Sequence, residues 1–150
     1  MNTPKSTTPP CIIPTLRYRD GQVAIDWLCK VFGFHAQLVV PDQGGGIAHA
    51  QLTYGNSMVM LGSANNNAFH QLVKSPLEIG GIGSQSVYIV VPDVDAHYQG
   101  AVAAGAEIVI AIQDEDYGGR AYSCRDPEGH VWNFGSYDPW AATALHHRCS

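Results

Sequence analysis

The side chains of this 150-residue chain that could carry out the greatest variety of chemistry are those of its seven histidines and four cysteines. They can bind metals, transfer protons or act as nucleophiles. The cysteines show no CxxC or other metal-ligand spacing, so buried thiols in a reducing compartment are the simpler interpretation. Among the scattered histidines, His49 lies in the middle of an expected strand, between Ala48 and Ala50. It is a candidate binding residue, and a hydrogen-bonded structural histidine is the alternative.

Charged residues offer a second kind of chemistry. Arg120 and Tyr122 follow an acidic run at 114–116, which indicates either a rim that closes over a ligand or a turn held by an arginine–carboxylate pair. Glu78 and Glu107 could act as general bases, but no pattern places them beside a reacting group. No Ser–His–Asp or Cys–His arrangement is recognisable, so the catalytic residues stay unassigned.

Composition narrows the class of protein. The 8 Lys and Arg against 13 Asp and Glu give a net charge of −5 without any basic cluster, which argues against nucleic acid as a partner. No apolar run approaches the roughly 20 residues of a membrane span. Residues 1–10 lack the apolar segment of a secretory signal, so we expect a flexible arm there and a cytoplasmic protein. A hydrophobic content of 45% is typical of a compact globular chain.

The elements that must position these residues repeat along the chain. Two amphipathic helices are expected, at 21–32 and from Asp93 or Asp95 to about 104. The expected strands are 11–19, 35–40, 47–54, 57–61, 86–91, 107–112, 119–125 and 130–135. Aspartates before the helices and glycines after helices or in turns recur at a spacing of 72 to 74 residues, namely Asp20 and Asp93, Gly33 and Gly105, Gly55 and Gly129. Each half therefore reads as strand–helix–strand–strand–strand.

This repeat predicts how the chain is organised. A module at about 11–61 and a second at about 84–138 form one domain, 11–138, with a C-terminal tail at 139–150. Residues 62–83 lack periodicity, which is typical of a lid or a mobile loop. One such module leaves a sheet face bare, and two modules can pair their sheets around a concave site.

Three segments carry a resemblance to a known family. They are DPEGHVWNF at 126–134, DYGGRAY at 116–122 and PTLRYRD at 14–20. With the repeat, they resemble the vicinal oxygen chelate superfamily of glyoxalase I, fosfomycin and bleomycin resistance proteins and extradiol dioxygenases, and its PhnB-like branch in particular. The resemblance implies an α+β fold in which two βαβββ modules join their mixed sheets into a concave cup.

The resemblance also bears on metal binding. Metal-dependent members place a histidine on the first strand of each half and a carboxylate near the end of each last strand. Counted from the capping aspartates and the turn glycines, these positions hold Ile13, Val59, Ser86 and Asn133. Because these side chains would bind a divalent ion weakly at best, we expect no metal and no cofactor.

If these positions face the cup, the two-residue period of a strand brings their neighbours into it as well. Arg17 would bind a carboxylate or phosphonate bidentately, although an internal ion pair or a stem along the sheet would also explain it. Tyr88 would stack on a ligand or hydrogen-bond to it, and core packing is the alternative. The whole candidate ligand-binding set is Arg17, Thr15, Ser57, Ser86, Tyr88, Asn133, His49, Arg120 and Tyr122.

The function that this pattern favours is metal-independent binding of a small anionic or aromatic molecule. Sequestration of a drug or metabolite, as in bleomycin resistance, is the model that the resemblance supplies. One alternative is a glyoxalase-like lyase or isomerase, or a dioxygenase-type enzyme, with a non-standard metal or base such as His49 or Glu78. Another is a structural homodimer with a filled cavity. A homodimer is expected in any case, because pairing across a two-fold axis covers sheet edges.

Overall fold

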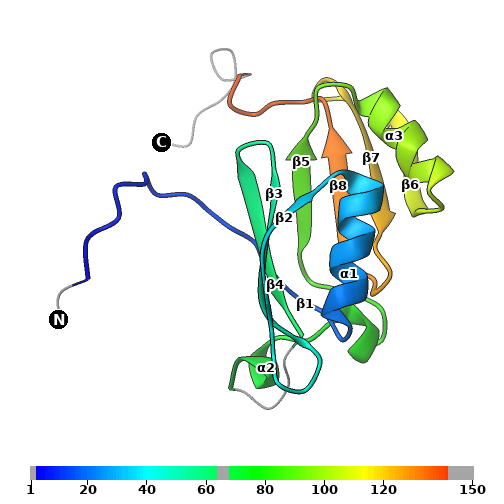
Figure 1. Cartoon of the computed structure of the whole chain (residues 1–150). Helices are drawn as coiled ribbons and strands as arrows, with labels where there is room; N and C mark the ends of the chain where they lie inside the picture. The colour runs from blue at the N-terminus through cyan, green and yellow to red at the C-terminus, as the bar shows by residue number, and fades with distance from the viewer. Residues whose placement is uncertain (1–2, 64–67, 142–150) are drawn as a thin grey trace.

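Eight strands form two mixed sheets of four in the computed structural model, which describes residues 3–63 and 68–141 (Figure 1). The first sheet has the order β1-β4-β3-β2 and the second the order β5-β8-β7-β6. In each, the first strand of the module runs parallel to the last, and the other pairs are antiparallel. The strands are β1 (Thr15–Arg17), β2 (His35–Pro41), β3 (Ile47–Tyr54), β4 (Ser57–Gly62), β5 (Ser86–Val90), β6 (Glu107–Asp114), β7 (Arg120–Arg125) and β8 (Val131–Gly135). The predicted α+β fold of two βαβββ repeats is confirmed.

The two predicted helices begin and end close to the residues that the sequence indicates. Helix α1 (Gly21–Trp27) follows Asp20, whose carboxylate accepts a hydrogen bond from the Val23 amide at 3.1 Å, and it continues into a π-helical turn, η1 (Leu28–Phe32). Helix α3 (Val94–Ala103) follows Asp93, which caps it through the Ala96 amide at 3.0 Å. Of the two aspartates that could start this helix, Asp93 is therefore the cap.

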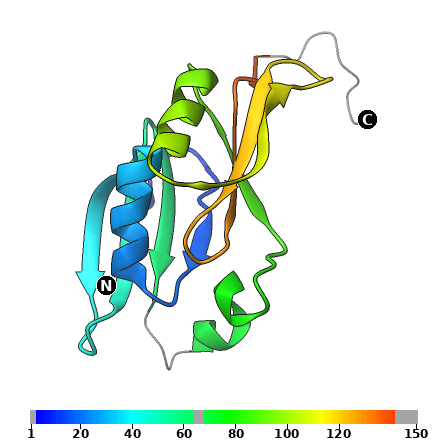
Figure 2. The same ribbon diagram turned by 90° about the vertical axis from the view of Figure 1, so that its right-hand side faces the viewer.

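One core joins the two halves. The ring of Phe32, at the end of η1, lies 5.4 Å from that of Trp132 and 4.7 Å from that of Phe134, both on β8. Both β8 side chains are fully buried. Figure 2 shows α1 and α3 next to each other. Helix α1 contacts β3 of the first sheet, and α3 contacts β6 and β7 of the second. Each sheet therefore has a core face, packed against a helix, and an opposite open face.

Two expected segments differ from the structure. The strand predicted at 11–19 pairs only over β1, because Pro14 has no amide hydrogen to donate and the preceding residues 3–12 are exposed. Within 62–83 the chain forms a short helix, α2 (Ala68–Leu72), and a 3₁₀ turn, η2 (Pro76–Glu78). No helix among the described residues is long and apolar enough to cross a bilayer.

The turn between β7 and β8 binds the first half through two buried carboxylates. Asp126 accepts the Tyr18 hydroxyl at 2.5 Å and the Trp132 indole N–H at 3.0 Å. Burial and this neighbouring carboxylate raise the pKa of Tyr18 well above its ordinary value, so its hydroxyl is a permanent donor at neutral pH. The turn thus anchors the chain just after β1.

Glu128 makes the second set of contacts. Its carboxylate accepts the Arg19 amide at 2.5 Å, the Asp20 amide at 2.8 Å and the Ser75 hydroxyl at 2.6 Å. Its backbone carbonyl accepts the Leu77 amide at 3.0 Å. One side chain therefore joins the start of α1, the segment around η2 and the β7–β8 turn.

Candidate functional site

A groove of about 720 Å³ runs between β1 and β5, the facing edge strands of the two sheets. Residues of both strands line it, and the segment 72–79 forms a further wall. Four of the candidate binding residues, Thr15, Arg17, Ser86 and Tyr88, line this groove. The pairing of the two modules therefore brings together residues that are about 70 positions apart in the sequence.

Among the residues that the structure describes, the charged side chains of the groove are all cationic. Arg17 and Lys74 line it, and no aspartate or glutamate of 3–63 and 68–141 does. Arg17 is only 5% exposed, and its guanidinium passes close to Gly62, where a β-carbon would lie 3.4 Å from Nη1. The remaining lining is mostly apolar, with a few hydroxyl and amide groups. Such a surface suits an anionic ligand with an apolar body.

Tyr88 supplies the aromatic surface of the groove. Its hydroxyl donates to the Tyr137 carbonyl at 2.7 Å, and its side chain remains 37% exposed. Partial burial raises the pKa of Tyr88 above its ordinary value, so the ring stays neutral at physiological pH. A neutral, partly exposed ring can stack on a planar ligand.

Ser86 and Asn133 lie side by side on the open face, but their polar groups are already engaged. The Asn133 amide donates to Ser86 Oγ at 3.0 Å and to the Val87 carbonyl at 3.1 Å. Its carbonyl oxygen accepts the Ser123 hydroxyl at 2.6 Å. Asn133 therefore stabilises the second sheet across three strands, β5, β7 and β8.

The facing predicted for β4 is wrong by one residue. Thr15 pairs with Met60 and Leu16 with Leu61, so Met60 shares the open face while Val59 and Leu61 are buried on the core face. Ser57 is two residues before Val59, so it lies on the same face as Val59 and Leu61, opposite to that of Thr15 and Arg17. Counting from the turn glycines gave Val59, but the strand register gives Met60, which is 73 residues before Asn133.

His49 lies on the open face of the first sheet, away from the groove. It is half-buried on β3, and its Nε2 donates to the Gln51 side-chain carbonyl at 2.9 Å. Of the two roles considered, this contact fits the hydrogen-bonded structural one.

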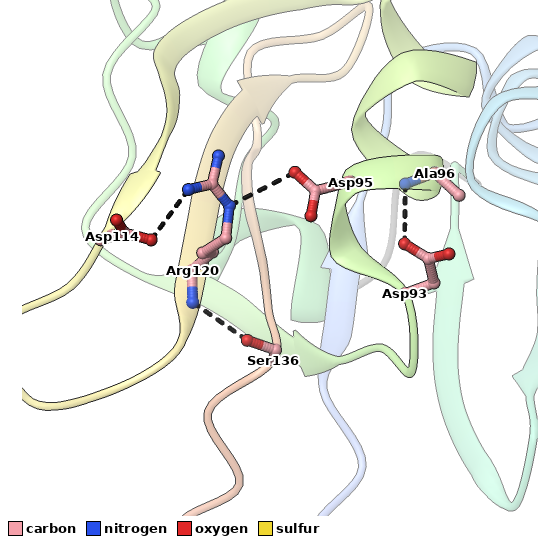
Figure 3. Close-up of polar contacts among 6 residues, drawn as sticks. All are labelled: Asp93, Asp95, Ala96, Asp114, Arg120 and Ser136. Carbon is pink, nitrogen blue, oxygen red and sulfur yellow. Dashed lines mark hydrogen bonds and ion pairs between the residues drawn. The ribbon is translucent and has the colours of Figure 1, made fainter.

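Arg120 takes part in an ion-pair cluster at the start of β7 (Figure 3). Its Nη1 lies 2.8 Å from Asp114 Oδ1 and its Nε 3.3 Å from Asp95 Oδ1. Its backbone amide donates to Ser136 Oγ at 3.0 Å. The arginine–carboxylate pair is thus the geometry that the structure shows here, and it ties the β6–β7 hairpin to α3.

Tyr122 lies inside the core and not at a rim. It is 1% exposed, and its hydroxyl donates to Nδ1 of His97 at 2.6 Å. The other ring nitrogen of His97 donates to the Phe32 carbonyl at 3.1 Å, which fixes the neutral tautomer. Burial lowers the pKa of His97 below its ordinary value of 6.5. This pair couples the two modules beneath the sheets.

The residues present do not fit the metal site of metal-dependent relatives. By the observed register, the four corresponding positions hold Ile13, Met60, Ser86 and Asn133. Across residues 3–63 and 68–141, no three His, Cys, Asp or Glu side chains come together as a metal site would require. These four side chains offer a divalent ion no suitable set of donors.

Several groove residues escape sequence analysis. Lys74 and Ile79 come from the segment without periodicity, and His130 follows the β7–β8 turn. His130 donates through Nε2 to the Arg17 carbonyl at 2.8 Å and packs on the Tyr18 ring at 4.7 Å. No repeat or spacing signals these positions, and the contacts that place His130 join residues more than 100 positions apart.

The fold agrees with the comparisons to known proteins. The chain belongs to the glyoxalase/bleomycin resistance protein/dioxygenase superfamily, whose family model matches residues 12–134. It is 33% identical over 126 residues to protein Mb0911c of Mycobacterium bovis, a match that covers 84% of this chain and 82% of that protein.

Solved structures give the same result. TioX from Micromonospora sp. ML1 is 37% identical with a TM-score of 0.66, covering 84% of this chain and 94% of TioX. The bleomycin resistance determinant encoded on the transposon Tn5 has a TM-score of 0.61 at 15% identity, over 87% of this chain and 99% of that one. The latter likeness shows the fold alone.

Proposed function

We propose that this protein binds a small anionic molecule with an aromatic or other apolar body, without a metal ion, and thereby sequesters a drug or metabolite. The single observation that carries the proposal is the groove between β1 and β5, which Arg17 and Lys74 line and to which the described part of the chain contributes no carboxylate. In a chain with a net charge of −5, a concave site with only cationic charges is a local exception.

The expected energetics favour Arg17 as the main contact. A hydrogen bond to a charged group contributes about 1.5–3 kcal/mol, or roughly 10- to 150-fold in affinity. An arginine can donate two such hydrogen bonds to the same carboxylate. Lys74 adds a single charge on a flexible stem. The apolar lining would bury the ligand body, and Tyr88 would contact its ring.

Sequestration is favoured over catalysis because no carboxylate of the described residues lines the groove to act as a general base. The titratable side chains that line it are Arg17, Lys74, Tyr88 and His130, and His130 donates through Nε2 to the Arg17 carbonyl, which holds its ring against the backbone of β1. The superfamily's bleomycin resistance proteins supply the model of binding without turnover. Within the superfamily, the segments 14–20 and 116–122 support placing the chain in the PhnB-like branch.

Isothermal titration calorimetry with 2-naphthoate and its uncharged analogue 2-naphthamide tests the proposal. We expect naphthoate to bind at least tenfold more tightly than the amide, and Arg17→Gln to remove that preference. Lys30→Gln, which removes an exposed cation of η1, is the matched control. Equal affinities for acid and amide would refute the anion preference. Native mass spectrometry after titration with zinc, nickel, manganese and iron tests the metal-free part, and tight stoichiometric metal would overturn it.

We also propose that the protein is a homodimer. Strand β2 is a sheet edge, and three consecutive residues on it, Leu38, Val39 and Val40, are 37–42% exposed. An apolar edge strand is a template for pairing with a second copy. Size-exclusion chromatography with light scattering tests this, and a mass of 16.1 kDa in solution would refute it.

A further inference from the structure

We propose that Gly135 determines the size of ligand that the groove accepts, because it lets the Tyr88 ring lie back over β8, where it forms one wall of the groove and does not extend across it. The inference rests on the proposed function, since it concerns the same groove. It assigns Gly135 as a positioning residue, which acts on the ligand only through Tyr88.

The position of Tyr88 in its sheet allows its side chain to point in either of two directions. Strand β5 is an edge strand whose only neighbour in its sheet is β8, and the groove lies along its other flank, towards β1. Tyr88 pairs with Asn133, and Gly135 is two residues further along β8 on the same open face. A side chain at 88 can therefore lean over β8 or stand over the groove.

Tyr88 leans over β8 and occupies the space that a side chain at 135 would need. A β-carbon on Gly135 would lie 2.9 Å from Tyr88 Cε1 and 3.0 Å from Cζ, both inside van der Waals contact. The hydroxyl reaches past the strand and donates to the Tyr137 carbonyl at 2.7 Å. The absence of a side chain at Gly135 thus provides the space that the Tyr88 ring occupies, and the Tyr137 carbonyl accepts a hydrogen bond from its hydroxyl.

An alanine at 135 would move the ring and leave the strand in place. Gly135 does not have a left-handed backbone, so alanine brings no φ strain. Its carbonyl accepts the Val91 amide at 2.9 Å, and the next amide, of Ser136, donates to Arg120, which fixes this part of the chain. The mobile partner is the tyrosine side chain. Released from Tyr137, it rotates away from β8 and narrows the groove.

The experiment compares ligands of two sizes on four variants. We expect Gly135→Ala to weaken 2-naphthoate binding at least tenfold and benzoate binding less than threefold. Tyr88→Ala removes the obstructing ring, so Tyr88→Ala and the double variant Tyr88→Ala/Gly135→Ala should bind naphthoate within twofold of each other. Gly100→Ala is the matched control, because no atom lies within 4 Å of a β-carbon there. Urea denaturation confirms that each variant folds.

Two results would overturn the inference. One is an equal loss of benzoate and naphthoate affinity in Gly135→Ala. The other is a Gly135→Ala effect that persists in the Tyr88→Ala background. Nuclear Overhauser contacts of a labelled Tyr88 ring report its position without any ligand. If the wild type binds neither carboxylate, the proposed function fails. The Overhauser contacts of the Tyr88 ring in the wild type and in Gly135→Ala still decide whether Gly135 sets the position of that ring.

Discussion

Replacing Glu128 by glutamine should destabilise the protein far more than its place in a turn would indicate. The carboxylate accepts three hydrogen bonds, from the Arg19 and Asp20 amides and the Ser75 hydroxyl, at 2.5–2.8 Å, and the residue is 7% exposed. A glutamine keeps one acceptor oxygen and points an NH₂ group at a buried donor. The change removes the charge from the contacts that remain and leaves at least one donor unsatisfied.

The magnitude follows from these contacts. A hydrogen bond to a charged group contributes about 1.5–3 kcal/mol, and an unsatisfied buried donor costs about 1–3 kcal/mol. We therefore expect Glu128→Gln to lower the free energy of unfolding by roughly 3 kcal/mol. For a chain of this size that corresponds to a fall in Tm of about 6–12 °C. Urea denaturation followed by tryptophan fluorescence and circular dichroism measures it.

Two comparisons make the test specific. Ser75→Ala removes one of the three donors and should cost about 1–2 kcal/mol, and its effect should be smaller in the Glu128→Gln background because the two residues interact. Glu107→Gln is the matched control, since Glu107 pairs with Arg125 at 2.8 Å but is 64% exposed, so its loss should cost less than about 1 kcal/mol. A Glu128→Gln effect no larger than that of Glu107→Gln would refute the reasoning.

Three further predictions concern residues outside the groove. Because burial lowers the pKa of His97 below 6.5, the unfolded chain binds a proton on His97 that the folded chain does not. Urea denaturation should therefore show that the free energy of unfolding falls as the pH drops below about 6.5. A His97→Gln variant whose free energy of unfolding depends on pH with the same slope would contradict this. Arg120→Gln should leave the urea midpoint close to that of the wild type in the same assay, because the ion pair of Arg120 with Asp114 is exposed to solvent. Burial raises the pKa of the Cys124 thiol to about 12, so mass spectrometry after iodoacetamide treatment at pH 8 should find the exposed Cys11 modified and Cys124 unmodified unless urea is added.

The local elements of the fold could be predicted because the signals for them lie within a few residues. Asp20 and Asp93 cap their helices through amides three positions on, and Gly33 ends the first with a φ of 90°. The two-residue alternation likewise placed Tyr88 and Asn133 on one face of their sheet. Each of these features depends on neighbours in the chain, which the sequence displays directly.

The facing of β4 and the placement of Tyr122 needed the three-dimensional structure. Local counting put Val59 with Thr15, but the pairing of β4 with β1 across 45 residues sets the register at Met60. Tyr122 follows an acidic run in the sequence, yet the pairing of β7 with β8 turns its side chain into the core beside Phe134. A shift of one residue moves a strand side chain to the opposite face, so local patterns cannot decide between faces.

The sequence by itself determined the repeat, the caps and the superfamily, since periodicity and short motifs are properties of neighbouring residues. The tertiary structure alone decided the groove. It brought Lys74 from an aperiodic segment against Arg17 and Tyr88 from two different sheets. It also placed the carboxylate of Glu128, in the DPEG turn, against two distant segments. Ser75 precedes Glu128 by 53 residues, and Arg19 and Asp20 precede it by more than 100. These arrangements arise only when two sheets pack around one core, because no local energy favours them before the chain folds.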